Sequence, residues 1–269
     1  MTDLLSGLLD DLTAEGDQLR ETVDRLGVDG WTAATPAPGW TVATTVAHLL
    51  WTDEVAVLAA HSHESAEAKQ AWDDVVLAAI NDPMGYVDAG ALELAERPRE
   101  EILDRWAASR TALRTALTGY PSGQKMPWFG PPMSAASMAT ARFMETWAHA
   151  LDVYDAAGRR PEPTDRIKHV AYLGVRTRNY SYSVHAEEPP AEEFRVELSA
   201  PSGEVWSWGP EDAAQRVSGS AYDFCLLATQ RVNRADTDLV AVGEDAEHWL
   251  GIAQAFAGPP GPGRQPEHG

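Results

Sequence analysis

The spacing of the apolar residues is the feature that most limits the fold of the first 157 residues. Apolar side chains recur there at intervals of three and four residues, which is the period of an amphipathic helix. Prolines, glycines and short polar runs separate one predicted helix from the next. The predicted helices cover about residues 3–27, 41–60, 64–95, 98–118 and 134–157, and the third is broken near Asn81, Asp82 and Pro83. Such helices bury their apolar faces by packing together, so we expect a helical bundle.

A change of composition marks the end of this bundle. Residues 158–166, GRRPEPTDR, read as a linker, and we expect Gly27 to close the first helix and Gly158 the last. After the linker, two segments alternate between apolar and polar residues as strands do, and Ser202-Gly203 between them is a two-residue hairpin signal. The elements predicted there are a helix over 166–178, strands over 194–201 and 204–210, an apolar helix at the end of 211–231 and a last helix over 244–257.

The predicted fold class is therefore α+β, with a four-helix bundle followed by a small α+β domain. The bundle covers residues 1–158 and the second domain covers residues 166–257. The last segment, 258–269, has the proline- and glycine-rich composition of a disordered tail.

The charge and the cysteine content of the chain restrict its function. The formal net charge is −20, which disfavours binding to nucleic-acid phosphates or to anionic membrane surfaces. No apolar run reaches the roughly 18 residues of a membrane helix, and the N-terminus lacks the basic segment of a signal peptide, so we expect a cytoplasmic protein. The single cysteine, Cys225, lies in an apolar run, where we expect a small buried residue.

The strongest chemical signal is FMETWAHALDVYDAAG at residues 143–158. Glu145 and His149 lie four residues apart, so a helix places both on one face, where they could share a metal ion. Asp152 follows on the same side and could orient His149 through its second ring nitrogen. The third candidate ligand is His48, in the middle of an apolar helix, although a lone histidine there is more often a hydrogen-bonded core residue.

Three protein ligands would leave a coordination position open, as in catalytic rather than structural zinc sites. Zinc is the first choice of metal, while nickel, iron or manganese also accept nitrogen and carboxylate ligands.

Other candidate residues have two interpretations each. Trp128, in the proline-rich loop YPSGQKMPWFGPP, could cover the mouth of a pocket or pack the loop. Arg231 and Arg234 could form an anion clamp or a solvated helix end. Trp40, which follows Pro38-Gly39, reads as an anchor of the turn.

Two of these motifs resemble a known family. APGWTVATTVAHLLWTDE and METWAHALDVYDAAG resemble the second and last bundle helices of DinB-like proteins, in particular the mycothiol-dependent maleylpyruvate isomerase family. The resemblance implies that His48, Glu145 and His149 bind a divalent metal, and that the thiol mycothiol coordinates the same ion. VSGSAYDFCLLATQRVNRAD is similar to the smaller, sterol-carrier-like domain of that family, which implies a catalytic arginine after this helix.

That arginine corresponds to Arg231, or else to Arg234, although this chain has Thr-Gln-Arg where the family has Thr-Gly-Arg. We therefore take Arg231 and Asp152 as candidate catalytic residues, and Arg234 and Trp128 as candidate contacts to the cofactor.

Three functions stay open at this point. The first is a metal-dependent enzyme that uses a small thiol, either as an S-transferase or as an isomerase of an electrophilic small molecule. The second is a hydrolase, lyase or cyclase that uses the metal without a thiol, with Asp53 or Asp152 as general base. The third is a non-catalytic module that binds a metal and a small ligand. Either a monomer or a homodimer fits the sequence.

Overall fold

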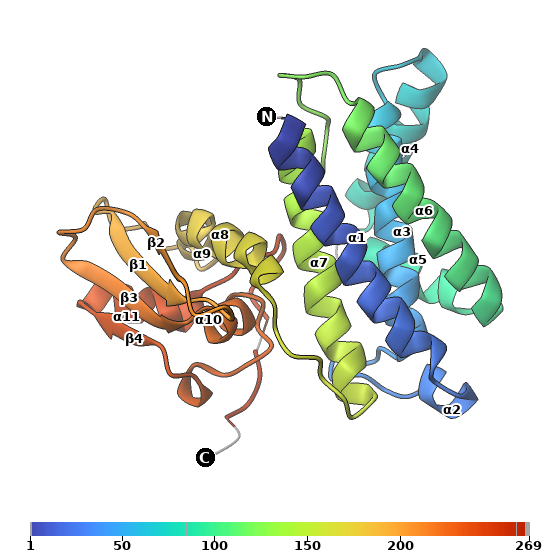
Figure 1. Cartoon of the computed structure of the whole chain (residues 1–269). Helices are drawn as coiled ribbons and strands as arrows, with labels where there is room; N and C mark the ends of the chain where they lie inside the picture. Colours follow the sequence, from blue (N-terminus) through green and yellow to red (C-terminus); the bar gives the residue numbers. More distant parts are fainter. Residues whose placement is uncertain (1, 84, 262, 267–269) are drawn as a thin grey trace. The chain divides into compact units, whose positions relative to one another are not determined.

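The computed structural model describes residues 2–83, 85–261 and 263–266. The chain divides into two compact units, Met1–Arg160 and Pro161–Gly269 (Figure 1). The first unit is helical and the second contains a four-stranded sheet with helices. The α+β class, with a helical N-terminal part, is thus confirmed.

The first unit is a bundle built on its longest helices. Helices α5, α6 and α7 pack against α3, and α1 packs against α7. Helix α3 is buried along most of its length because its residues are apolar on nearly every side. The helices of this unit are α1 (Thr2–Asp24), α2 (Val28–Trp31), α3 (Val42–His61), α4 (Ala66–Asn81), α5 (Tyr86–Ala95), α6 (Arg99–Gly119) and α7 (Ala135–Ala156).

Local sequence signals explain where helices α3 and α7 begin and where α7 ends. The hydroxyl of Thr41 accepts a hydrogen bond from the Thr44 amide at the start of α3, and that of Ser134 caps α7 in the same way. Helix α7 ends as expected at Gly158, whose φ of 64° lies in the left-handed region. The amide of Gly158 donates to the Asp155 carbonyl and that of Arg159 to the Tyr154 carbonyl, which is the Schellman pattern.

Helix α3 is also long and apolar enough, by length and composition, to cross a membrane. However, 78% of the relevant window is buried inside the protein. Burial against other helices explains this apolar character, because the central helix of a bundle has no polar face to present to water.

In the first unit, the structure corrects the predicted end of the first helix and supports the predicted break in the third. The first helix ends at Asp24, and Gly27 instead precedes the short helix α2 with an ordinary φ of −73°. The segment 64–95 forms two helices, α4 and α5, that flank the predicted break.

The second unit contains the two predicted strands, β1 (Phe194–Ser199) and β2 (Val205–Trp208), and two strands that the sequence did not predict, β3 (Gln215–Ser220) and β4 (Val240–Val242). The strands lie in the order β2-β1-β3-β4. Strand β3 pairs parallel to β1, and the other pairs are antiparallel. Only Val217 of β3 is buried, so the strand lacks the apolar alternation that predicts a strand.

The turn between β1 and β2 is one residue longer than the predicted two-residue hairpin. The Gly203 amide donates to the Ala200 carbonyl, and the Ala200 amide donates to the Glu204 carbonyl. Gly203 has a φ of 89°, so the loop of Pro201, Ser202 and Gly203 is a turn followed by a left-handed glycine, a common three-residue hairpin connection.

Helices cover one face of this sheet. Phe194 of β1 and Phe224 both contact the ring of Trp249 at centroid distances of 5.7 Å, and Cys225 is buried beside them, as predicted. The helical segments of this unit are η1 (Asp165–Ile167), α8 (Lys168–Arg176), α9 (Arg178–Val184), α10 (Ala221–Ala228), η2 (Arg234–Asp236) and α11 (Glu244–Ile252). Helix α11 ends five residues before its predicted end at 257.

The segment predicted to be a disordered tail has neither helix nor strand at its described residues, 258–261 and 263–266. Some of its backbone groups still bond to the second unit. The Asn233 side chain donates to the Arg264 carbonyl, and the Tyr180 hydroxyl donates to the Gly258 carbonyl.

The residue that follows the C-terminal end of helix α10, Gln230, adopts a backbone conformation that favours glycine. The Gln230 amide donates to the Leu227 carbonyl and the Arg231 amide to the Leu226 carbonyl, so Gln230 occupies the position at which glycine is preferred in a Schellman motif. Its φ of 59° is left-handed, which costs a residue with a β-carbon free energy.

We therefore expect Gln230→Gly to raise the free energy of unfolding by about 1 kcal/mol, because glycine removes this steric cost. Urea unfolding followed by circular dichroism measures the change. Gln230→Ala keeps the β-carbon and serves as the control, so an equal gain in the alanine variant would show that the side chain, and not the backbone conformation, is responsible.

Candidate metal centre

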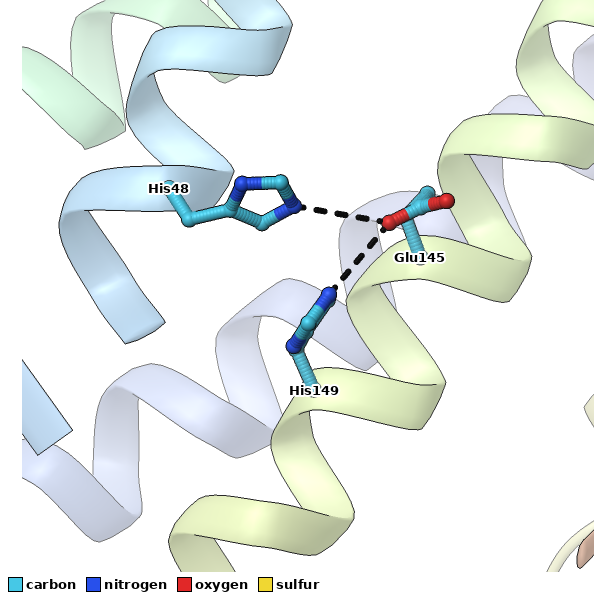
Figure 2. Close-up of side chains that lie close together, drawn as sticks. All are labelled: His48, Glu145 and His149. Atoms are coloured by element: carbon cyan, nitrogen blue, oxygen red, sulfur yellow. Dashed lines mark ion pairs between the residues drawn. The ribbon is translucent and has the colours of Figure 1, made fainter. Parts of the chain in front are cut away.

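Three potential metal ligands from two helices converge within the bundle. His48 projects from the middle of α3, while Glu145 and His149 project from successive turns of α7 (Figure 2). The Oε2 atom of Glu145 lies 3.5 Å from His48 Nε2 and 3.4 Å from His149 Nε2. One ligand atom from each residue can be chosen so that all lie within 4.8 Å of one another.

His48 is held as a neutral ring. Its side chain is 7% exposed, and neither ring nitrogen has a hydrogen-bond partner among the described residues. Burial, followed by the proximity of His149, lowers the pKa of His48 from 6.5 to about 4, although Glu145 acts in the opposite direction. A neutral imidazole offers the lone pair that a metal needs, without first losing a proton.

Glu145 is held as a carboxylate. Burial opposes its ionisation, but the contacts with His149 and His48 outweigh burial and place the pKa of Glu145 well below 4.5. Its side chain is 26% exposed and that of His149 is 16% exposed, so these two ligands are the more accessible members of the group.

The arrangement fits a divalent metal ion. The distances from Glu145 to the two histidines are long for hydrogen bonds. They match the spacing of about 3.3 Å between ligand atoms that surround one zinc ion tetrahedrally at zinc–nitrogen and zinc–oxygen distances of about 2.0–2.1 Å. Two imidazoles and one carboxylate are also a common catalytic donor set. His48 Nε2, which has only the 3.5 Å ion pair with Glu145, would gain a bond to the ion.

Trp40 borders this group, which the sequence did not indicate. Its ring stacks on His149 at a centroid distance of 5.5 Å and an interplanar angle of 12°, and it lies 5.0 Å from the His48 ring. The turn that contains Trp40 leads directly into α3, so its position eight residues before His48 was the available signal. An indole at this place shields the imidazoles from water on one side.

Asp152 lies next to His149 on the same helix. Its Oδ2 is 3.6 Å from His149 Nδ1, and its side chain is 2% exposed. This distance is that of an ion pair rather than of a direct hydrogen bond. The placement agrees with an orienting role for Asp152, which stays a prediction.

Trp128 packs into an aromatic cluster. Its ring stacks on Trp72 at 6.1 Å and contacts Phe129 at 5.1 Å, and it packs against a cluster that includes Val55 and Ala59 of α3. Val55 follows His48 by seven residues, or roughly 10 Å along the helix axis. The packing interpretation of Trp128 accounts for these contacts, and its role as a cofactor contact stays a prediction.

The two candidate arginines belong to the second unit. Arg231 Nη1 donates to the Thr229 carbonyl at 2.6 Å. Arg234 donates to the Thr237 hydroxyl at 3.2 Å and to Glu247 Oε2 at 3.3 Å. Arg234 is thus held in an ion pair with Glu247, and the anion-binding roles of both arginines stay predictions.

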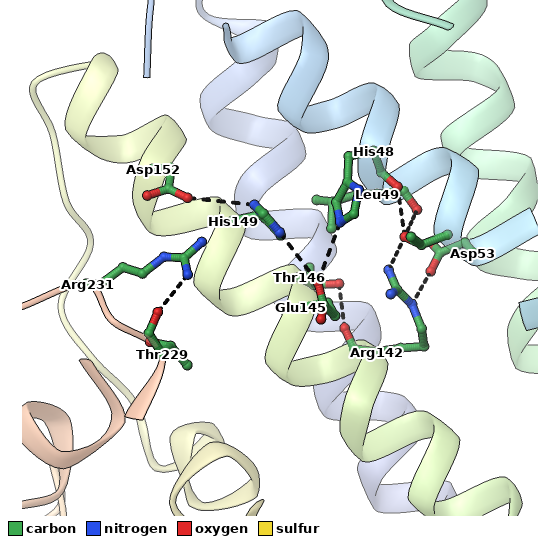
Figure 3. Close-up of polar contacts among 11 residues, drawn as sticks. His48, Leu49, Asp53, Arg142, Glu145, Thr146, His149, Asp152, Thr229 and Arg231 are labelled. Atoms are coloured by element: carbon green, nitrogen blue, oxygen red, sulfur yellow. Dashed lines mark hydrogen bonds and ion pairs between the residues drawn. The ribbon is translucent and has the colours of Figure 1, made fainter. Parts of the chain in front are cut away.

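A buried ion pair joins the two ligand-bearing helices close to this group (Figure 3). Arg142 Nε donates to Asp53 Oδ1 at 2.9 Å, and both side chains are 5% exposed or less. Burial raises the pKa of Asp53 above 3.8, against the opposing effect of Arg142. Asp53 is thus bound and enclosed, which argues against its predicted use as a general base.

Comparison with known proteins gives two family matches. The family described as the mycothiol maleylpyruvate isomerase N-terminal domain matches residues 12–154, which include all three ligand candidates. The family described as wyosine base formation matches residues 190–242, the segment that contains the sheet. The sterol-carrier-like character expected of the second domain stays a prediction.

Two relatives extend over almost the whole chain. They are uncharacterized proteins of Mycobacterium tuberculosis, from strains CDC 1551 and H37Rv, and each is 55% identical over 254 residues. These alignments cover 94% of this chain and 96% of each relative.

Two solved structures share the fold. They are the mycothiol-dependent maleylpyruvate isomerase and a mutant of it in which a histidine is replaced by alanine, with TM-scores of 0.56 and 0.57. Each is 15% identical to this chain, and the superposition covers 88% of this chain and 92% of the other.

The neutral state of His48 predicts how the metal-free protein responds to acid. Since the pKa of His48 is about 4 in the folded protein and 6.5 in the unfolded chain, the unfolded chain takes up a proton first. The stability that neutral His48 provides is present above pH 6.5 and is lost as the pH falls toward 4. At pH 5 this loss should reach about 2 kcal/mol.

We expect metal-free His48→Gln to lose less stability than the metal-free native protein between pH 7 and pH 5, by about 2 kcal/mol. Urea unfolding of chelator-treated protein at both pH values measures the difference. His61→Gln, at a half-exposed histidine, is the control and should behave like the native protein. Equal losses in the native protein and His48→Gln would contradict a neutral buried His48.

Proposed function

Because the chain belongs to the mycothiol maleylpyruvate isomerase N-terminal domain family, we propose that it is a metal-dependent enzyme that uses a small thiol such as mycothiol. The metal is a divalent ion, with zinc as the first choice and nickel or iron as alternatives. The reaction is either an isomerisation or an S-transfer on an electrophilic small molecule.

One observation carries this proposal. His48, Glu145 and His149 place their ligand atoms within 4.8 Å of one another, and the ring nitrogens of His48 have no hydrogen-bond partner among the residues described. A core histidine that served only the fold would be expected to satisfy its nitrogens with protein groups. Three donors on rigid helices would also leave a position for an exogenous ligand.

A divalent ion held there would favour the thiolate form of a bound thiol over the thiol, which supplies a nucleophile at neutral pH. The side chains complete the site around it. His48 and His149 contribute no charge and Glu145 contributes one negative charge, so a dication would keep a net positive charge that attracts an anionic sulfur. Asp152 orients the His149 ring, and Trp40 excludes water from one side of both imidazoles.

Arg231 is the candidate for the substrate's anionic group. Its Nη1 is fixed to the Thr229 carbonyl by a hydrogen bond, which limits the motion of the guanidinium at the end of helix α10. Arginine suits a carboxylate because its planar fork can donate two parallel hydrogen bonds. This role comes from the family resemblance and from the placement of Arg231 after the apolar helix.

The remaining parts of the proposal concern the surroundings of the protein. The net charge of −20 supports a small-molecule substrate rather than nucleic acid or membrane as the partner. We place the protein in the cytoplasm, as a monomer or a homodimer.

The metal site predicts the metal content of purified, untagged protein. We expect about one equivalent of metal per chain in the native protein, and its loss in both His48→Ala and His149→Ala, because two remaining ligands bind a single ion weakly. Elemental analysis measures the content. His61→Ala should retain the metal. A folded native protein that contains no metal and takes up neither zinc nor nickel would exclude a metal-dependent function.

The use of a thiol predicts a metal-dependent proton release. Titration of zinc-loaded protein with mycothiol should release about one proton per thiol bound, because the bound sulfur is a thiolate, and metal-free protein should show no such release. Calorimetry in two buffers of different ionisation enthalpy measures it. Binding without proton release, or no binding at all, would favour a metal-dependent enzyme that uses no thiol.

A further inference from the structure

A continuous set of buried hydrogen bonds connects α7 to the backbone of the metal-ligand helix α3 (Figure 3). Arg142 Nε donates to Asp53 Oδ1 at 2.9 Å, and Arg142 Nη2 donates to Thr52 Oγ1 at 2.7 Å. Thr52 Oγ1 in turn donates to the carbonyl of His48 at 2.7 Å. We call Arg142, Asp53 and Thr52 the Arg142 link. It begins on the helix that carries Glu145 and ends on the backbone of His48.

The link lies one helical turn away from the ligands on both helices. Thr52 follows His48 by four residues, and Arg142 precedes Glu145 by three. If α3 slid along α7 by one turn, roughly 5.4 Å, both the Arg142 link and the group of ligands would be lost together. The same relative position of the two helices therefore satisfies both sets of contacts.

Stability alone does not account for this arrangement. Burying a charged pair costs desolvation free energy, and apolar side chains of similar volume often do as well or better. A guanidinium differs from apolar side chains because its donors point in fixed directions. Apolar packing between α3 and α7 has no such directional requirement. A shift of even 1 Å would matter for ligand atoms that must meet around one ion.

We propose that Arg142 is a positioning residue, which acts through Asp53 and Thr52 to hold His48 at metal-binding distance from Glu145 and His149. This inference rests on the proposed metal site. Arg142 does not itself touch the metal, and its task is to fix the position of α3 relative to α7.

Zinc affinity tests the inference in the purified full-length chain, by competition with a chromophoric chelator. Thr52→Val is nearly isosteric but removes the hydroxyl, so we expect a 10- to 100-fold loss of zinc affinity, the usual effect of a lost outer-shell partner. Thr52→Ser keeps the hydroxyl and should retain most of the affinity. Arg142→Lys keeps the charge but lacks the fork, and it should lose affinity as Thr52→Val does.

The visible absorption spectrum of the cobalt-loaded protein gives a second measurement, because it reports the geometry of the ligands. We expect a changed spectrum in Thr52→Val and Arg142→Lys and a native spectrum in Thr52→Ser. The double variant Arg142→Met with Asp53→Leu removes both buried charges without leaving one unpaired, and it should remain helical by circular dichroism while binding zinc less tightly.

A neighbouring ion pair provides the matched control. Glu54 follows Asp53 on α3 and accepts hydrogen bonds from Arg105 of α6 at 3.0 and 3.1 Å, with both side chains more than a third exposed. Glu54→Gln and Arg105→Lys break an α3 contact of the same chemical type that does not involve α7. Both should bind zinc as the native protein does.

The results of these experiments distinguish a failure of the positioning role of Arg142 from a failure of the proposed metal-dependent function. Native zinc affinity and a native cobalt spectrum in folded Thr52→Val and in the double variant would overturn the positioning role. Unfolding of both variants would also overturn it, because the link would then be a requirement for folding in general. A native protein that binds neither zinc nor nickel would overturn the proposed function, and the positioning role with it, and titrations of the native protein alone identify that case.

Discussion

Helix α3 carries His48, Thr52 and Asp53 into the centre of the bundle, where water cannot solvate them. Every polar group in such a place needs a protein partner, an ion or a compensating charge. Thr52 and Asp53 obtain theirs from Arg142 of α7, while the ring nitrogens of His48 obtain no hydrogen bond among the described residues. The burial of one helix thus dictates both the ion pair and the metal-binding character of the histidine.

The electrostatic state of the site follows from the same burial. Burial keeps His48 neutral, while the two histidines keep Glu145 ionised. His48 and Glu145 are therefore ready to bind a cation without a change of protonation. Most of the formal net charge of −20 comes from residues outside this group.

The fold does not determine a reaction, because the two units match two different families. The bundle matches a domain of mycothiol-dependent isomerases, whereas the sheet of the second unit matches a family described by wyosine base formation. A shared scaffold supports many reactions, since the groups that surround the substrate decide the chemistry.

The sequence by itself determined the elements whose signals are local. The apolar period of the bundle helices, the caps at Thr41 and Ser134 and the left-handed Gly158 are all legible in the chain, and so are the fold class and the break between α4 and α5. The spacing of Glu145 and His149 is equally local, because two residues on one helix need no knowledge of any other element.

Only the tertiary structure decided which distant side chains meet. Strand β3 is too polar to be recognised before it pairs in parallel with β1, and the partner of a parallel strand is remote in the chain. The same holds for Trp40 on His149 and for Arg142 with Asp53, which lie 109 and 89 residues apart. Such contacts depend on how helices pack against each other, and a period of 3.6 residues specifies a buried face but not the neighbour that covers it.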